Sequence, residues 1–409
     1  MKISLFCIAL LLSACSRRKP LPIKPGGPSV VTVDSPSAGA VGPSVDELEP
    51  NDDVAHAQEL KFDLVLRGSI SGAGDNDLFW FQSPARSLDS ADGGIDFDEV
   101  RIELRALSGL HLALDLLDAE QQTLLAHRSD SIVVPNFGIT PGRRYFVRLA
   151  AADKLVDDNR YTLVAHVARA RAGSEVEPND ERSRETPVLG LSSSGYFGWP
   201  SDTDWLRLPL NRGTDRVLQF ELTGVSGVAC ELSIVGDSGL PIAATRGKPG
   251  AELRLRNIGL PDKLTDAHVM LHARSGANVE ERWVLRASVE PWLEGTEREP
   301  NDSATTANLI NAASPTVSGF LWPGDVDVFR LQGFGDGLIG ARLEGISGIG
   351  LRLERLDETG KGMQRVEGGA GKDVELAPLP AKAGTLFRIS ARPQDTVFET
   401  PYRLNITTK

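Results

Sequence analysis

The chain has 409 residues, and its 44 Lys and Arg stand against 56 Asp and Glu, which gives a formal net charge of −12. Nucleic-acid binding rests on a basic face that neutralises phosphates, so this balance argues against a nucleic-acid partner. The 41 Gly and 25 Pro, together with few helical periods, predict a loop-rich all-β protein.

The first residues predict a lipoprotein signal peptide over residues 1–14. Lys2 gives a positive start, and the apolar run that follows is too short for a bilayer span of about 20 residues but suits a signal peptide. The run ends in Leu12-Ser13-Ala14-Cys15, which resembles a bacterial lipobox. That resemblance implies that Cys15 carries palmitate and further acyl chains as a membrane anchor. Ser16 at the next position implies delivery to the outer membrane, with the periplasmic or surface face left open.

Residues 15–45 predict a flexible tether behind this lipidated cysteine. They are rich in Pro, Gly, Ser, Val and Ala and show no amphipathic period, so they cannot bury a core. No later segment resembles a transmembrane helix, so we expect the lipid to be the anchor. Cys230 is then the remaining thiol, which predicts no intramolecular disulfide and a buried structural cysteine.

The rest of the chain is organised around an acidic motif, Glu-x-Glu-Pro-Asn-Asp, that occurs three times. The copies begin at Glu47, Glu175 and Glu297, so they lie 128 and 122 residues apart, and each is followed by an Asp-x-Asp before an apolar or aromatic residue. This period is longer than the roughly 20–50 residues of a solenoid unit and fits whole domains. It predicts three β-sandwich modules over residues 46–172, 173–294 and 295–409.

The strand pattern of the first module supports this division. Residues 53–60 predict a short helix capped by Asn51 or Asp52. Apolar residues then alternate with polar ones over 100–106 and 112–116, and two further strands, at 145–149 and 161–164, close the module.

The second and third modules carry the same landmarks. Alternation recurs over 218–222 and 341–343, and each stretch is followed by a Gly-x-Ser-Gly turn and another strand. All three modules end on an aromatic residue followed two positions later by leucine, at Tyr161, Trp283 and Tyr402. Short strands separated by turn signals predict sandwiches, and the short linkers at 168–173 and 291–295 predict a semi-rigid array.

The acidic motif has the chemistry of a calcium site. An extended Glu-x-Glu puts both carboxylates on one face, Pro fixes the next backbone angle, and Asn-Asp supplies a turn with more oxygens. If the Asp-x-Asp loop folds back, the carboxylates repel one another unless a cation lies between them. Oxygen ligands without His or Cys suit one or two Ca²⁺ ions. The alternative is that Asn-Asp caps a helix and Asp-x-Asp tops a hairpin.

The Glu-x-Glu-Pro-Asn-Asp, the later Asp-x-Asp and the terminal Tyr-x-Leu resemble the bacterial pre-peptidase C-terminal (PPC) domain in all three modules. The resemblance implies a jelly-roll-like β-sandwich, with calcium bound through the N-terminal acidic segment as in the collagen-binding domains of clostridial collagenases. Family members usually follow a secreted protease, which this sequence does not contain, so the accessory role is not implied. The implied calcium ligands are Glu47, Glu49, Asn51, Asp52, Asp75 and Asp77; Glu175, Glu177, Asn179, Asp180, Asp202 and Asp204; and Glu297, Glu299, Asn301, Asp302, Asp325 and Asp327.

The sequence does not predict an enzyme. It contains no His-Glu-x-x-His and no Gly-x-Ser-x-Gly, and the recurring Gly-x-Ser-Gly is typical of a turn. Trp199 and Trp322, each followed by Pro, precede the Asp-x-Asp of modules 2 and 3, whereas module 1 has Gly72-Ala73 there. These indoles could stack on a saccharide or peptide, or pack at the module edge under the loop.

The leading hypothesis is therefore a non-catalytic cell-envelope lipoprotein whose calcium-stabilised modules bind extracellular protein or polysaccharide. The alternatives are a scaffold subunit of a secretion, motility or envelope assembly, and a hydrolase with an unrecognised site.

Overall fold

The computed structural model describes residues 43–85, 97–107, 109–188, 190–210, 216–236, 239–259, 265–335, 337–380, 382, 384–392 and 399–408. The predicted signal peptide, Cys15 and all but the last residues of the tether lie outside the described residues. Residues Pro43–Lys409 form one compact unit. No helix in the described part of the chain is long and apolar enough to cross a membrane.

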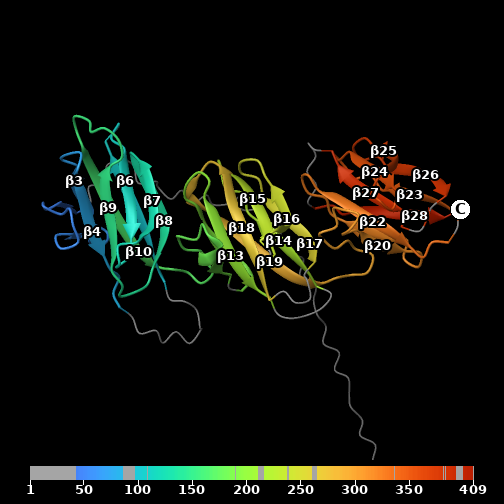
Figure 1. Ribbon diagram of the computed structural model, residues 1–409, viewed down its shortest axis with the longest axis horizontal. Coiled ribbons are helices and arrows are strands. Elements are labelled where there is room, and N and C mark those ends of the chain that lie inside the picture. Colours follow the sequence, from blue (N-terminus) through green and yellow to red (C-terminus); the bar gives the residue numbers. More distant parts are fainter. Residues whose placement is uncertain are drawn as a thin grey trace, which may run out of the picture. The chain divides into compact units, whose positions relative to one another are not determined.

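The described residues form 28 strands and a single 3₁₀ turn, η1 (Arg182–Arg184), which confirms the all-β prediction (Figure 1). The strands make six sheets, and these fall into three successive pairs along the chain. The strand order is the same in each pair, except that module 1 has an additional edge strand, β1 (Ser44–Asp46), so the repeat seen in the sequence is also a repeat of the fold.

In the first module, one sheet has the order β1 (Ser44–Asp46), β3 (Val65–Ser69), β10 (Arg160–Arg169), β5 (Asp98–Ala106) and β8 (Ser131–Ile139). The other has the order β2 (Gln58–Glu59), β4 (Asn76–Phe81), β9 (Tyr145–Ala151), β6 (Leu112–Leu117) and β7 (Thr123–Ser129).

The second module repeats both sheets. The first contains β12 (Ser192–Phe197), β19 (Asn278–Pro291), β14 (Arg216–Leu222) and β17 (Leu253–Gly259). The second contains β11 (Thr186–Pro187), β13 (Thr203–Pro209), β18 (Asp266–Ser275), β15 (Ala229–Val235) and β16 (Pro241–Arg246).

The third module follows the same plan. Its first sheet contains β21 (Thr316–Gly319), β28 (Tyr402–Thr408), β23 (Leu338–Leu343) and β26 (Val374–Pro380). Its second contains β20 (Asn308–Asn311), β22 (Val326–Gln332), β27 (Leu386–Ala391), β24 (Leu351–Leu356) and β25 (Gly362–Glu367). The edge strands β8, β17 and β26 are therefore equivalent.

Each pair of sheets encloses its own apolar core. In β5 the side chains of Val100, Ile102 and Leu104 are fully buried, while the residues between them face outward, as the alternation in the sequence predicts. The two equivalent cores are built in the same way from the later sheets. Cys230 is fully buried in the second core, which confirms the predicted structural thiol.

The short helix predicted over residues 53–60 is wrong. The chain makes a turn there and then enters β2, which pairs in parallel with β4. Asp53 Oδ1 accepts the backbone N–H groups of Ala55 and His56 at 2.9 and 3.0 Å, so the side chain stabilises a turn that competes with helix. The segment is also too short to overcome the cost of helix nucleation.

Candidate metal centres

The acidic motif runs extended at the start of each module, beside the module's own sheet. The first glutamate of each motif donates its N–H to a carbonyl there: Glu47 to Arg67 O, Glu175 to Ser194 O and Glu297 to Ser318 O, each at 2.9 Å. The second glutamate is joined to the following proline by a cis peptide bond in all three copies. The repeated sequence is therefore one repeated backbone conformation.

The Asp-x-Asp segment folds back onto this strand, as the calcium hypothesis requires. The asparagine after the proline accepts the N–H of the residue that follows Asp-x-Asp. Leu78 N–H reaches Asn51 O at 3.0 Å, Trp205 N–H reaches Asn179 O at 3.2 Å, and Val328 N–H reaches Asn301 O at 3.0 Å. This contact brings the second aspartate of each Asp-x-Asp close to the two glutamates of the motif.

Carboxylate oxygens converge at the same place in every module. In what we call the inner clusters, oxygens of three carboxylates lie within 4.8 Å of one another, and these are Glu47, Glu49 and Asp77; Glu175, Glu177 and Asp204; and Glu297, Glu299 and Asp327. Outer clusters that share the second glutamate occur in modules 1 and 3, and these are Glu49, Asp52 and Asp75; and Glu299, Asp302 and Asp325. In module 2, Asp180 and Asp202 occupy the corresponding sequence positions.

A glycine on the neighbouring strand makes room for the first glutamate. The residues are Gly68, Gly195 and Gly319, and a Cβ at Gly195 would lie 2.1 Å from Glu175 Cγ. The residue after each glycine donates its N–H to the glutamate Oε1, from Ser69 at 2.5 Å, Tyr196 at 3.1 Å and Phe320 at 2.6 Å. Sequence reasoning missed these glycines, although their recurrence after each motif was a visible signal.

The aromatic residue near each module's end also belongs to the site. Tyr161 OH donates to Glu47 Oε2 at 2.9 Å and to Asp77 Oδ2. Trp283 Nε1 donates to Asp204 Oδ2 at 3.0 Å, and Tyr402 OH donates to Glu297 Oε2 at 2.7 Å. In the sequence, this aromatic residue is recognisable as a landmark of the last strand. Its function is to hold one side of the acidic cluster.

Several oxygens of the clusters are buried and have no hydrogen-bond partner among the described residues. An unpaired polar atom in the interior is costly, so such atoms are rare in folded proteins. Asn51, Asn179 and Asn301 are fully buried, as are the second aspartates of all three modules. The unpartnered oxygens are Asn51 Oδ1, Asp77 Oδ1, Asn179 Oδ1, Asp202 Oδ1, Asp204 Oδ1, Glu299 Oε1, Asn301 Oδ1 and both carboxylate oxygens of Asp327.

Burial and mutual repulsion strongly favour the neutral forms of these carboxyl groups. Desolvation, followed by the charges of neighbouring carboxylates, raises the pKa of Asp77 to about 8 and that of Glu299 to about 8. The pKa of Asp204 and that of Asp327 are raised well above the usual range for the same reasons. Without a counter-charge, the folded chain thus disfavours ionising its own motif.

The residues present fit a hard divalent cation. The converging donors are carboxylate and amide oxygens, which are the ligands that Ca²⁺ takes, and Ca²⁺ tolerates irregular geometry. A cation among the inner carboxylates would supply the missing counter-charge and give the unpartnered oxygens a ligand role. Asn51, Asn179 and Asn301 would contribute their Oδ1 atoms to the same ion.

Trp199 and Trp322 both pack against the module that precedes them. The Trp199 ring lies 4.5 Å from the His127 ring, centroid to centroid, and packs on the core of module 1. Trp322 is 7% exposed and belongs to the core of module 2. Both indoles are therefore packing residues in this structure, and their partners lie in the preceding module.

Comparison with known proteins finds similarity to solved structures of low sequence identity. No family model and no curated protein matches the chain. Solved structures with similarity include the CUB1-EGF-CUB2 domains of rat MASP-1, at 8% identity and a TM-score of 0.16, covering 54% of this chain and 99% of that chain. A putative secreted protein from Eubacterium rectale matches at 8% identity and a TM-score of 0.20, covering 59% and 81%. A triple jelly-roll protein of an archaeal virus matches at 10% identity and a TM-score of 0.22, covering 90% and 97%.

Proposed function

We propose that this chain is a non-catalytic cell-envelope lipoprotein whose three β-sandwich modules are stabilised by calcium and bind an extracellular protein or polysaccharide. The observation that carries the calcium part is the set of buried, unpartnered oxygens in all three modules. One such group could be a local peculiarity of packing. The same three carboxylates and one amide, placed by the same backbone contacts in each copy, indicate a selected site.

The position of the clusters supports a structural role for the bound metal. Each inner cluster joins the first strand of its module to the Asp-x-Asp strand and, through Tyr161, Trp283 or Tyr402, to the closing strand. An ion at this point would tie together parts of the chain that are far apart in sequence. Such an ion binds the folded state and not the unfolded chain, so it adds to stability.

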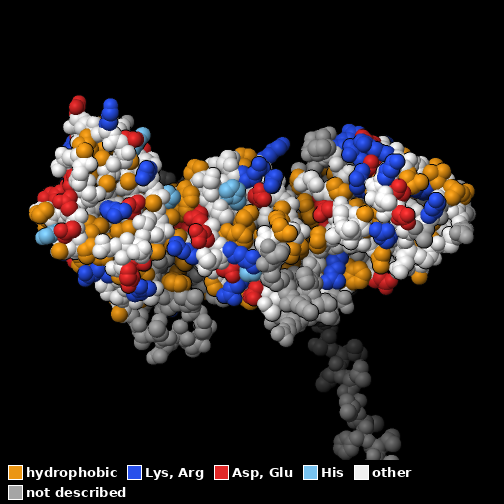
Figure 2. Space-filling model, in the orientation of Figure 1, with side chains coloured by type: hydrophobic (Ala, Val, Ile, Leu, Met, Phe, Trp, Pro, Cys, Tyr) orange, Lys and Arg blue, Asp and Glu red, His pale blue; other side chains and the backbone are white. Residues whose placement is uncertain are grey.

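The anchor and the family rest on the sequence. The lipobox ending in Cys15 and the resemblance of the modules to PPC domains support an envelope location and a binding function. The described surface offers mixed chemistry to a ligand. On the face shown in Figure 2, Lys and Arg side chains gather over β24 and β25, where Arg352 and Arg365 both pair with Glu367. We therefore leave the ligand class as protein or polysaccharide.

Calorimetric unfolding of residues 43–409, with calcium and then with EGTA, tests the metal part. This unit contains all three cores, so it is expected to fold by itself. A ligand at a hundredfold excess over its dissociation constant stabilises the folded state by about 2.7 kcal/mol per site. We expect a large upward shift in Tm that Glu49→Gln, Glu177→Gln and Glu299→Gln together abolish. An identical Tm in calcium and EGTA would refute calcium stabilisation.

Pull-down from envelope fractions and binding to polysaccharide arrays, each in calcium and in EGTA, test the ligand part. Retention of a defined protein or glycan would support the binding function. Recovery of a stoichiometric protein complex instead would favour a scaffold subunit.

A further inference from the structure

The acidic motif of modules 2 and 3 pairs with the edge strand of the module before it. Glu177 N–H donates to Asn136 O at 3.0 Å, and Gly138 N–H donates to Glu177 O at 2.8 Å. The same pair of bonds joins Glu299 to β17, from Glu299 N–H to Asn257 O at 2.9 Å and from Gly259 N–H to Glu299 O at 2.7 Å. Each contact is a parallel bridge to an edge strand. The second glutamate of the acidic motif therefore also pairs, through its backbone, with the edge strand of the preceding module.

An asparagine of the preceding module reaches into the acidic cluster. Asn136 Nδ2 donates to Glu175 Oε1, and Asn257 Nδ2 donates to Glu297 Oε1 at 3.3 Å. Both asparagines are at least nine-tenths buried and lie in a β-bulge of their edge strand. Each thus holds the first glutamate of the next module in place from outside that module.

The glycine two positions later permits the close approach. A Cβ at Gly138 would lie 2.8 Å from Val176 Cβ, and a Cβ at Gly259 would lie 2.8 Å from Glu299 O. Real Cβ atoms are not found at such distances from neighbouring atoms. Asn-x-Gly on the edge strand is therefore the docking site for the Glu-x-Glu of the next module. Trp199 and Trp322 each pack on the core of the same preceding module.

Among the described residues, the features of this junction occur on the edge strands β8 and β17 and not on the equivalent strand β26. In the bulge of β26, the positions equivalent to Asn136 and Gly138 hold Pro378 and Pro380. Proline has no N–H to donate at the second position. In module 1, which has no module before it in this sequence, Gly72-Ala73 stands where the later modules have Trp-Pro. Three modules with one fold thus differ in the residues that form the junctions.

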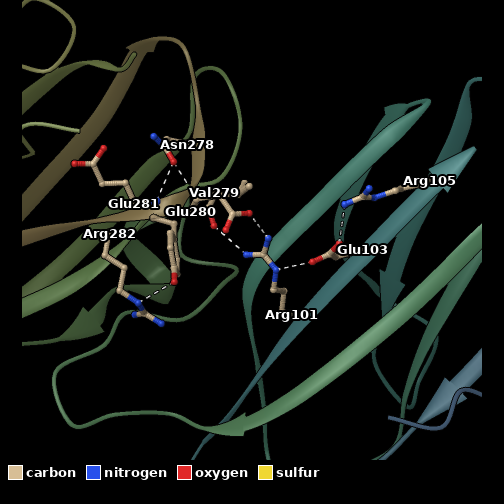
Figure 3. A network of polar contacts seen from close by, with 9 residues as sticks. Arg101, Glu103, Arg105, Asn278, Val279, Glu280, Glu281 and Arg282 are labelled. Atoms are coloured by element: carbon tan, nitrogen blue, oxygen red, sulfur yellow. Dashed lines mark hydrogen bonds and ion pairs between the residues drawn. The ribbon is translucent and has the colours of Figure 1, made fainter. Parts of the chain in front are cut away.

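Docking also lowers the solvent exposure of the acidic motif. Glu49 is exposed, and Leu48 beside it is 69% exposed, whereas Glu177 and Glu299 are each 2% exposed. At the first junction the contact widens beyond the motif. Arg101 of β5 donates to Val279 O at 2.9 Å and to Glu280 Oε1 at 2.6 Å on β19 (Figure 3).

We propose that the second and third acidic clusters are composite calcium sites, completed by Asn136 and Asn257 of the preceding module, so that calcium binding and module docking are coupled. This rests on the proposed calcium function. The bound ion neutralises carboxylates that would otherwise repel one another at the junction, and the docked asparagine and edge strand hold those carboxylates in place for the ion. Among the described residues, no edge strand of another module pairs with the first acidic motif, so the first site stands outside this coupling.

Calcium titration by calorimetry and hydrogen–deuterium exchange on residues 43–409 test the proposal. The exchange readout is the amide N–H of Gly138, Glu177, Gly259 and Glu299, because these four groups make the junction bonds. In wild type we expect the four amides to exchange faster in EGTA than in calcium. Amides of β9, inside the first module, serve as the internal reference. Asn136→Ala should weaken calcium binding at the second site by about tenfold, as loss of a group that orients a metal ligand does.

Two further variants separate coupling from misfolding. Pro378→Ala is the matched control, since it alters the equivalent bulge, where no acidic motif of the described chain pairs, and it should leave binding and exchange unchanged. Gly138→Val should block docking without touching a carboxylate, and it should reproduce the weaker second site and the faster exchange at Glu177. In both junction variants the first and third sites should bind as in wild type.

The outcomes distinguish this proposal from the proposed calcium function on which it rests. Absence of any calcium binding to wild type would overturn both. Wild-type calcium affinity in Asn136→Ala and Gly138→Val, or junction amides that exchange equally in calcium and EGTA, would overturn the coupling and leave the calcium sites standing.

Discussion

The second aspartate of each Asp-x-Asp is fully buried in its cluster, and the free-energy cost of ionising it is the clearest consequence of the site's geometry. Asp204 is fully buried. Its Oδ2 accepts from the Trp283 indole N–H, and its Oδ1 has no hydrogen-bond partner among the described residues. An ionised carboxylate in this position is unfavourable unless a cation compensates it. The same residue should therefore destabilise the metal-free protein and stabilise the calcium-bound one.

Asp204→Asn tests that double role. The amide keeps an oxygen that can accept from Trp283 Nε1, but it removes the buried charge. We expect the Tm of residues 43–409 in EGTA to stay the same or to rise, and the calcium-dependent stabilisation of module 2, about 2.7 kcal/mol at a hundredfold excess of calcium, to be lost. Differential scanning calorimetry measures both. Glu252→Gln, on an exposed ion pair with Arg254, is the control and should change neither. A large loss of stability in EGTA would contradict the assignment.

The raised pKa values predict how stability depends on pH in the absence of metal. Asp77 and Glu175 have ordinary values of 3.8 and 4.5, and burial raises the pKa of each to about 8 in the folded chain. Below the ordinary value both states are protonated, and the favourable contribution of the buried neutral group is fully present. As pH rises towards 8, the unfolded chain gains by ionising, so the folded state loses stability.

We therefore expect the free energy of unfolding in EGTA to fall between about pH 4 and pH 8. Calcium competes with protons for the same oxygens, so the stabilisation by calcium should grow over that interval. Urea unfolding at a series of pH values, with and without calcium, measures both trends. Stability in EGTA that rises from pH 5 to pH 8 would show that the carboxyl groups are not forced together as described.

At the scale of strands, the close approach of the glutamate to a glycine is the tightest constraint on the site. A side chain at Gly195 would occupy the position of the Glu175 side chain, and Gly195 lies in β12 with no positive φ to explain the glycine. The glycine is therefore required by space and not by backbone conformation.

Gly195→Ala should destabilise module 2 by about 1–3 kcal/mol, the usual cost of overpacking, and should remove its calcium response because Glu175 is displaced. Gly72→Ala is the matched control, since no atom lies within 4 Å of a Cβ built there. Chemical denaturation in calcium and EGTA measures the two effects. An alanine at 195 that leaves the calcium response intact would show that Glu175 is free to move away from the cluster.

The strands could be predicted from the sequence because alternation reports directly on burial at each position, as in β5 and over residues 112–116 of β6. The acidic residues of the site could also be named, since their spacing repeats. The prediction of a helix over 53–60 failed because the hydrogen bonds of one side chain, Asp53, decided the local structure. Tyr161, Gly195 and Asn136 were missed as site residues because their roles depend on which strands become neighbours. The separation of residues along the sequence does not show which strands become neighbours.

At the scale of the whole molecule, the modules and the anchor are separate devices. All three cores and all the acidic clusters lie within Pro43–Lys409, and the predicted lipobox lies within residues 1–42. Loss of the lipid should therefore change where the protein is found without changing how the modules fold or bind calcium. This separation makes the anchor testable by one substitution.

Cys15→Ser in the full chain, expressed in a bacterium that processes lipoproteins, should abolish labelling by a palmitate analogue and shift the protein from the membrane fraction to the soluble fraction. Stable anchoring requires more than one acyl chain, and serine at this position offers no thiol for the lipid. Cys7→Ser is the matched control, because it alters the apolar run of the signal and leaves Leu12-Ser13-Ala14-Cys15 intact. Equal labelling of the two variants would rule out Cys15 as the lipid attachment site. Membrane retention of unlabelled Cys15→Ser would instead point to a partner that holds the modules at the membrane.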